Sequence, residues 1–86
     1  MPYIKQRIRA QYNGYLRQIT NMVMREKNPN AVMTYVIYKM IKTLYDKPEW
    51  DIKSDALKIL EAVKIEFYRK CIAEYEEEKI IENGDI

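Results

Sequence analysis

SDALKILEAVKIEFYRKCIAEYEEEKIIEN, residues 54–83, is the stretch that decides the fold. Apolar residues recur along it at three- and four-residue steps, which is the period of an amphipathic helix. Ser54 is a candidate N-cap and Gly84 a candidate C-terminal stop. At about 1.5 Å per residue the helix would be about 45 Å long, too long for two shorter helices to cover. We therefore expect its end, from Tyr75 onward, to project or to pack on a neighbouring subunit.

Two shorter helical segments precede this one. Residues 5–26 form an amphipathic pattern, and Asn28 followed by Pro29 predicts a helix stop and a new start. Residues 29–46 are apolar on nearly every side, which is typical of a buried helix. We expect this helix to pack on its own chain with one face and on another subunit with the other. The link that follows is predicted to be a loop in which Trp50 contacts the core, with stacking on a ligand as the alternative.

These segments predict an all-α fold: a three-helix single domain over residues 1–86 that assembles as a helical homo-oligomer, with a tetramer expected. An 86-residue chain buries too little surface to be more than marginally stable alone. No apolar run approaches a membrane span of about 20 residues, and the charged start is unlike a secretory signal, so a cytoplasmic protein is expected. The single cysteine, Cys71, is predicted to be a small core residue.

Charge is unevenly distributed along the chain, although the net charge is only +2. Residues 1–27 hold six Lys and Arg against one acid, Glu26, whereas residues 71–86 hold Lys79 against six acids. Two such poles indicate head-to-tail packing of the first and last segments or a basic site for an anion. The alternative is that both are solvated helix faces.

The composition argues against catalysis. The chain has no histidine and one cysteine, so it lacks the usual neutral-pH base and the common metal ligands, and its two glycines form no phosphate-binding loop. A weak cation site is conceivable on the acidic side of the last helix, but a solvated face is the favoured interpretation. That side comprises Glu74, Glu77, Glu78 and Glu82. We predict a protein that is not an enzyme and needs neither cofactor nor metal.

The residues that remain are suited to binding. Eight tyrosines, the arginines and a polar C-terminal tail can stack on bases, hold phosphates and contact base edges. The competing interpretation places most of the tyrosine rings in the core or at an interface, with each hydroxyl group in contact with water. A net charge of +2 and an acidic C-terminal end argue against binding to a nucleic acid polymer.

Several separated motifs resemble a family of small proteins that is frequent in phages and prokaryotic genomes. The matching blocks are Met1 to Ile4, Tyr35 to Ile37, Glu66 to Arg69, Tyr75 to Ile80, and Glu82 to Asp85. These blocks follow one another in the order and spacing of the family, and together they span essentially the whole chain. One departure is Ala73, where the family is expected to have proline before the Tyr-Glu motif.

The same family resembles the phage anti-CBASS sponges, helical tetramers that sequester cyclic dinucleotide signals such as 3′3′-cGAMP. The resemblance implies a non-enzymatic immune-evasion protein in the host cytoplasm, with one ligand bound at a symmetric subunit interface. It implies phosphate contacts from Lys5, Arg9 and Arg69, stacking by Tyr3, Tyr68 and Tyr75, and contacts to purine edges from Glu76, Asn83 and Asp85. Glu66 and Lys79 complete the candidate set.

Two other function classes stay open at this point. One is a protein-binding module or inhibitor that presents its C-terminal tail to a host or phage protein, and it predicts no nucleotide binding at all. The other is an accessory protein that binds RNA or DNA, and it predicts affinity for long polymers with a steep salt dependence.

Overall fold

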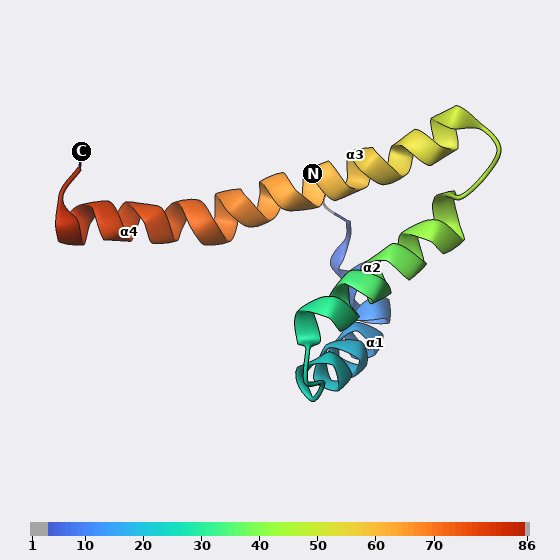
Figure 1. The fold of residues 1–86 in the computed structure, drawn as a ribbon, viewed down its shortest axis with the longest axis horizontal. Coiled ribbons are helices and arrows are strands. Elements are labelled where there is room, and N and C mark those ends of the chain that lie inside the picture. The colour runs from blue at the N-terminus through green and yellow to red at the C-terminus, as the bar shows by residue number, and fades with distance from the viewer. Residues whose placement is uncertain (1–3, 86) are drawn as a thin grey trace. The chain divides into compact units, whose positions relative to one another are not determined.

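The computed structural model describes residues 4–85, which form helices joined by short turns (Figure 1). The elements are α1 (Gln6–Met24), α2 (Pro29–Tyr45), α3 (Trp50–Phe67), η1 (Tyr68–Ile72) and α4 (Ala73–Asn83). This part of the chain contains no strand, so the prediction of an all-α fold is confirmed. None of these helices is long and apolar enough to span a membrane. The chain divides into two compact units, one ending at Lys47 and the other beginning at Pro48.

The first unit is a hairpin of α1 and α2. Asn28 ends the turn between the helices as predicted, because its side-chain oxygen accepts a hydrogen bond from the backbone N–H of Ala31 at 3.2 Å. Pro29 follows at the first helical position, where its missing N–H costs no helical hydrogen bond. Val23 of α1 is 8% exposed and is the only buried residue between residues 4 and 85.

The helix predicted to be buried, α2, has no buried residue in the structure of one chain. Tyr35, Tyr38 and Leu44 are each more than half exposed. A helix that is apolar on nearly every side needs cover on more than one face. The chain as described does not supply that cover, and packing against another subunit stays a prediction.

The second unit is one continuous helix in which α3, η1 and α4 follow each other without a break (Figure 1). The predicted start at Ser54 is wrong, because the helix begins four residues earlier at Trp50. The Ser54 hydroxyl instead donates to the carbonyl of Asp51 at 3.0 Å, within the helix. Asp51 itself lies in the first turn, where a negative charge is stabilised by the helix dipole.

Two residues that were expected in a core are exposed. Trp50 opens α3 with 71% of its surface accessible, and Cys71 lies exposed within η1. The reason is common to both: a helix by itself offers no second layer for such side chains to pack against. The predicted stop is confirmed, since Gly84 has φ 83° and its N–H donates to the carbonyl of Ile80 at 2.8 Å.

Candidate ligand-binding site

A cluster of three charged side chains lies where α3 passes into η1. One carboxylate oxygen of Glu66 is 2.6 Å from the guanidinium of Arg69 and 3.3 Å from the ammonium of Lys70. The Glu66 side chain is only 15% exposed, whereas Arg69 and Lys70 are 58% and 54% exposed. Every other charged residue between residues 4 and 85 is exposed. Glu66 is thus a partly covered anchor that holds two cations toward solvent.

The ionisation of Glu66 fits this role. The hydrogen bond from Arg69 lowers the pKa of the Glu66 carboxyl below its ordinary value, burial acts in the opposite direction, and Lys70 adds to the lowering. Glu66 therefore remains a carboxylate at neutral pH and keeps both cations in place.

The π-helical segment η1 changes which side chains share a side of the helix. Its bonding is shown by the backbone N–H of Ala73, which donates to the carbonyl of Tyr68 five residues earlier. Residues eight apart lie about 80° apart around a regular α-helix. A π-helical segment winds the chain less per residue, and here it brings Tyr68 and Glu76 to the same side.

Tyr68 and Glu76 are joined directly. The Tyr68 hydroxyl donates to a carboxylate oxygen of Glu76 at 3.0 Å, which ties η1 to α4. This hydrogen bond is the main cause that raises the pKa of Tyr68 above its ordinary value, followed by the negative charge of Glu76 and by burial. Tyr68 therefore stays a phenol and a donor at neutral pH.

A third contact lies farther along α4. The ammonium of Lys79 is 5.5 Å from the centre of the Tyr75 ring and 2.9 Å from a carboxylate oxygen of Glu82. One face of the Tyr75 ring is therefore already occupied by a cation, which leaves the other face for stacking.

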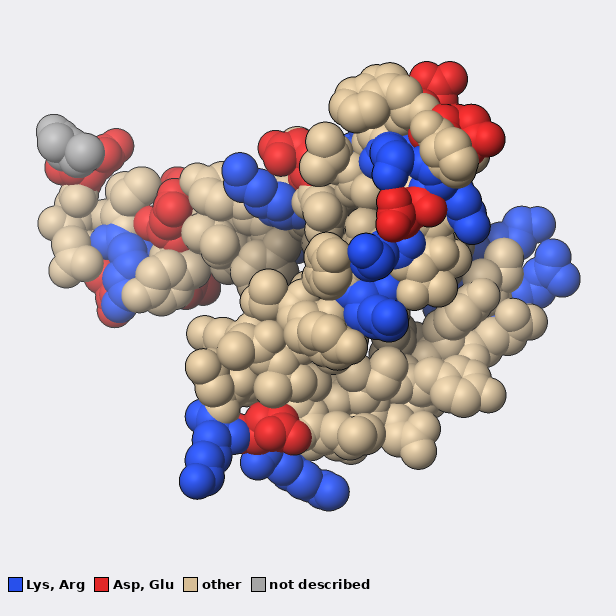
Figure 2. All heavy atoms as spheres, turned by 45° about the vertical axis from the view of Figure 1, so that its right-hand side comes forward, with Lys and Arg blue, Asp and Glu red and all other residues tan. Residues whose placement is uncertain are grey.

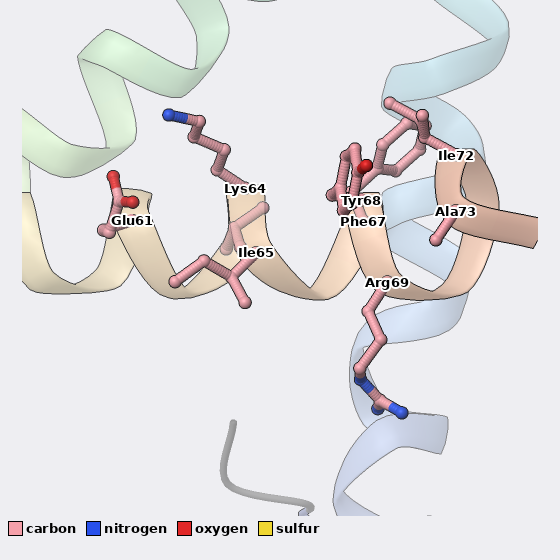
Figure 3. A pocket seen from close by; sticks show the side chains of 9 residues that line it. Glu61, Lys64, Ile65, Phe67, Tyr68, Arg69, Ile72 and Ala73 are labelled. Carbon is pink, nitrogen blue, oxygen red and sulfur yellow. The ribbon is translucent and has the colours of Figure 1, made fainter. Parts of the chain in front are cut away.

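An open hollow of about 730 Å³ adjoins η1 and is lined mainly by apolar side chains. Figure 3 shows that Phe67, Tyr68 and Ile72 project to one side of the helix, while Arg69 points to the opposite side. The stacking and phosphate candidates at this point are thus adjacent in sequence but face in different directions. Both Tyr68 and Arg69 nevertheless line this hollow.

The remaining predicted site residues lie elsewhere. Lys5 precedes α1 and Arg9 lies in its first turns, so both belong to the other unit. Asn83 ends α4, and Asp85 follows Gly84, whose positive φ turns the chain out of the helix. Tyr3 lies outside the described residues.

Sequence reasoning missed two parts of this site. Lys70 shares the Glu66 carboxylate, and its spacing of four residues from Glu66 was available as a signal. The π-helical segment itself has no such signature in the sequence. Within residues 4–85 no group of three metal-ligating side chains gathers.

A family model matches residues 1–86, the whole of the chain, and is described as a domain of unknown function, DUF6899. This protein belongs to the DUF6899 family. Comparisons with curated proteins and with solved structures found no match. The description of DUF6899 names no function, and the resemblance to the cyclic dinucleotide sponges stays a hypothesis.

Proposed function

We propose that this protein binds a cyclic dinucleotide such as 3′3′-cGAMP and holds it without turnover, as a viral immune-evasion protein that sequesters a signal of host anti-phage defence. The observation that carries the proposal is the arrangement around η1. Glu66 holds two cations, and one of them, Arg69, points to the side of the helix opposite the aromatic and apolar side chains of Phe67, Tyr68 and Ile72. Phosphates and purines are the two chemical groups that such a pair of surfaces suits.

Arg69 and Lys70 are the phosphate contacts. A guanidinium has five N–H donors in a fixed fork, so Arg69 can keep its hydrogen bond to Glu66 and still donate to a phosphate. Because Glu66 restrains both cations, less side-chain freedom is lost when the ligand binds.

Tyr68, Tyr75 and Glu76 are the base contacts. Aromatic rings stack on purines, and Tyr68 and Tyr75 are 48% and 56% exposed. Glu76 accepts one hydrogen bond from Tyr68, which leaves acceptor positions on its carboxylate for the N1–H and N2–H donors of guanine.

A ligand between two copies of the long helix would meet Arg69 of one chain and Tyr68 of the other. A cyclic dinucleotide has two phosphates and two bases related by an approximate two-fold axis, so a symmetric interface offers each contact twice. The proposal therefore includes a homo-oligomer, with a tetramer expected.

Calorimetric titration with cyclic GMP-AMP tests this function. Arg69→Ala should weaken binding by about 1.5 to 3 kcal/mol, which is roughly tenfold to more than a hundredfold, because a charge-assisted hydrogen bond is lost. Lys58→Ala is the matched control, since Lys58 forms an exposed ion pair of the same spacing with Asp55 at 3.7 Å. It should bind like the wild type. Intact ligand recovered after heat denaturation would support capture without turnover, whereas cleaved products would contradict it.

The outcomes separate the site from the function. Wild-type affinity in Arg69→Ala, with circular dichroism showing a folded helix, would remove Arg69 from the site. Failure of the wild type to bind any cyclic nucleotide would remove the function. It would then favour a module that binds a protein through its C-terminal end, for which the specific observation is Ile81, 79% exposed on α4.

A further inference from the structure

The most exposed large apolar side chain, among the residues described, lies in the middle of an acidic surface. Ile81 of α4 is 79% exposed. At helical spacing it shares a side with four glutamates, and we call this set the acidic side of α4. Its members are Glu74, Glu77, Glu78, Ile81 and Glu82. Figure 2 shows red acidic side chains gathered at the C-terminal end of the chain, on the left.

A surface of the opposite charge lies on α1. This helix contains three arginines and no acid, so its net charge is +3, whereas α4 has five glutamates and one lysine and a net charge of −4. Arg9, Arg17 and Met24 share one side of α1 at helical spacing, and Met24 is 76% exposed. We call these three residues the basic side of α1. Each of the two sides thus combines charge of one sign with an exposed apolar residue.

The length of the second unit requires cover from outside the chain. Large exposed apolar residues extend along it from Leu57 to Ile81, a span of about 36 Å at 1.5 Å per residue. The longer helix of the hairpin, α1, has 19 residues and is about 28 Å long. Wherever the hairpin lies along the long helix, part of that apolar row stays uncovered by its own chain.

We propose that the acidic side of α4 packs on the basic side of α1 of a second copy of this protein. The occupant is a second copy because the chain carries both complementary surfaces and its own hairpin is too short to cover the whole apolar row. Burial of Ile81 and Met24 supplies the attraction, while the opposite charges select the partner surface and its orientation. This interface would hold together the homo-oligomer of the proposed function, and the inference rests on that homo-oligomer. The interface itself needs no ligand.

Charge reversal tests the interface without ligand. Variant A, Arg9→Glu with Arg17→Glu, makes both surfaces acidic, and variant B, Glu74→Lys with Glu78→Lys, makes both basic. Light scattering should show that each variant alone falls from the oligomer to the mass of one chain. A mixture of A and B should assemble again, since each then offers the surface that the other lacks.

Two further preparations control the experiment. Asp55→Lys with Lys58→Glu reverses an exposed ion pair on α3 without changing α1 or α4, and it should keep the wild-type mass. A chain with all four substitutions of A and B should assemble with itself, which shows that the single-surface variants fail through charge and not through misfolding.

Each outcome decides. If A and B keep the wild-type mass, or if both dissociate and their mixture does not reassemble, the interface is refuted while the oligomer stands. Rescue in the four-substitution chain without rescue in the mixture would place the contact within one chain and also refute it. A wild type that is itself a monomer would remove the oligomer of the proposed function together with the interface. If the acidic side of α4 bound other proteins but not a second copy of this chain, that side would belong to a different partner and the proposed interface would be refuted.

Discussion

The hairpin and the long helix use their polar side chains differently. In the hairpin, Thr20, Thr34 and Thr43 bond to backbone carbonyls of their own helix, at 2.9, 2.7 and 2.7 Å. Along the long helix, Ser54 also bonds to a backbone carbonyl, but Tyr68, Arg69 and Lys79 bond to other side chains. The hairpin also contains the buried residue Val23, whereas no residue of α3 or α4 is buried. The difference teaches that the hairpin buries a residue of its own, whereas the hydrogen-bonded side-chain pairs of the long helix lie on its surface.

The largest expected effect comes from the buried position of the hairpin. Val23 is only 8% exposed, so Val23→Asp places a carboxylate in a buried position. The substitution should destabilise the protein by about 3 kcal/mol or more. Thermal denaturation followed by circular dichroism measures the loss. A change within about 0.5 kcal/mol would show that the hairpin has no core at this point.

The same substitution on the long helix sharpens the comparison. Val63 is 51% exposed in one chain, so Val63→Asp would be nearly neutral in a monomer. Because we propose that another copy covers this helix, we expect a loss of about 1 to 3 kcal/mol. The unfolding midpoint of the wild type should also rise with protein concentration, as for any oligomer that dissociates on unfolding. A neutral Val63→Asp with a concentration-independent midpoint would contradict the proposed cover.

A smaller effect should follow the ionisation of Glu66. The pKa of Glu66 in the folded protein is lowered, mainly by its hydrogen bond from Arg69. The ion pair therefore contributes stability that is fully present above the ordinary pKa of 4.5. This stability is lost as the pH falls through the lowered pKa of the folded protein. The difference in unfolding free energy between the wild type and Glu66→Gln should be constant from neutral pH down to that region and then shrink. A difference that is unchanged down to strongly acidic pH would show that the pair does not stabilise the fold.

The smallest effect concerns Tyr68, whose pKa is raised, mainly by its hydrogen bond to Glu76. Because the pKa of Tyr68 is raised in the folded protein, its hydrogen bond to Glu76 contributes stability below the ordinary pKa of 10.0. This stability is lost as the pH rises through the raised pKa of the folded protein. Tyr68→Phe should therefore be slightly less stable than the wild type at neutral pH and equal to it at strongly alkaline pH. Spectrophotometric titration of the tyrosines, compared between the two proteins, measures the shift directly.

Local signals in the sequence predicted the helices and two of their ends. Asn28 and Gly84 act through their own side chain and backbone, and both were assigned correctly. The start of the third helix was wrong because Ser54 is a good cap in isolation, whereas Asp51 already suits the first turn of a helix that begins at Trp50. The exposure of Trp50 and Cys71 could not be predicted, since it depends on which surfaces meet and not on the residues alone.

The candidate site was predictable only in part, for a related reason. The pairing of Glu66 with Arg69 follows from their spacing on one side of a helix. The contact of Tyr68 with Glu76 does not, because residues eight apart in a regular α-helix lie about 80° apart around the axis and about 12 Å apart along it. It arises from η1, whose hydrogen bonding depends on the fit of neighbouring turns and not on a recognisable motif.

The bond from the Ala73 N–H to the Tyr68 carbonyl makes the number of residues in η1 a constraint in its own right. Removing one residue would turn α4 by about 100° relative to α3 and redirect its five glutamates together. Relatives of this protein are therefore expected to keep the spacing between Phe67 and Ala73 even where the side chains between them change. A relative with proline at position 73 lacks this N–H and must satisfy the Tyr68 carbonyl in another way.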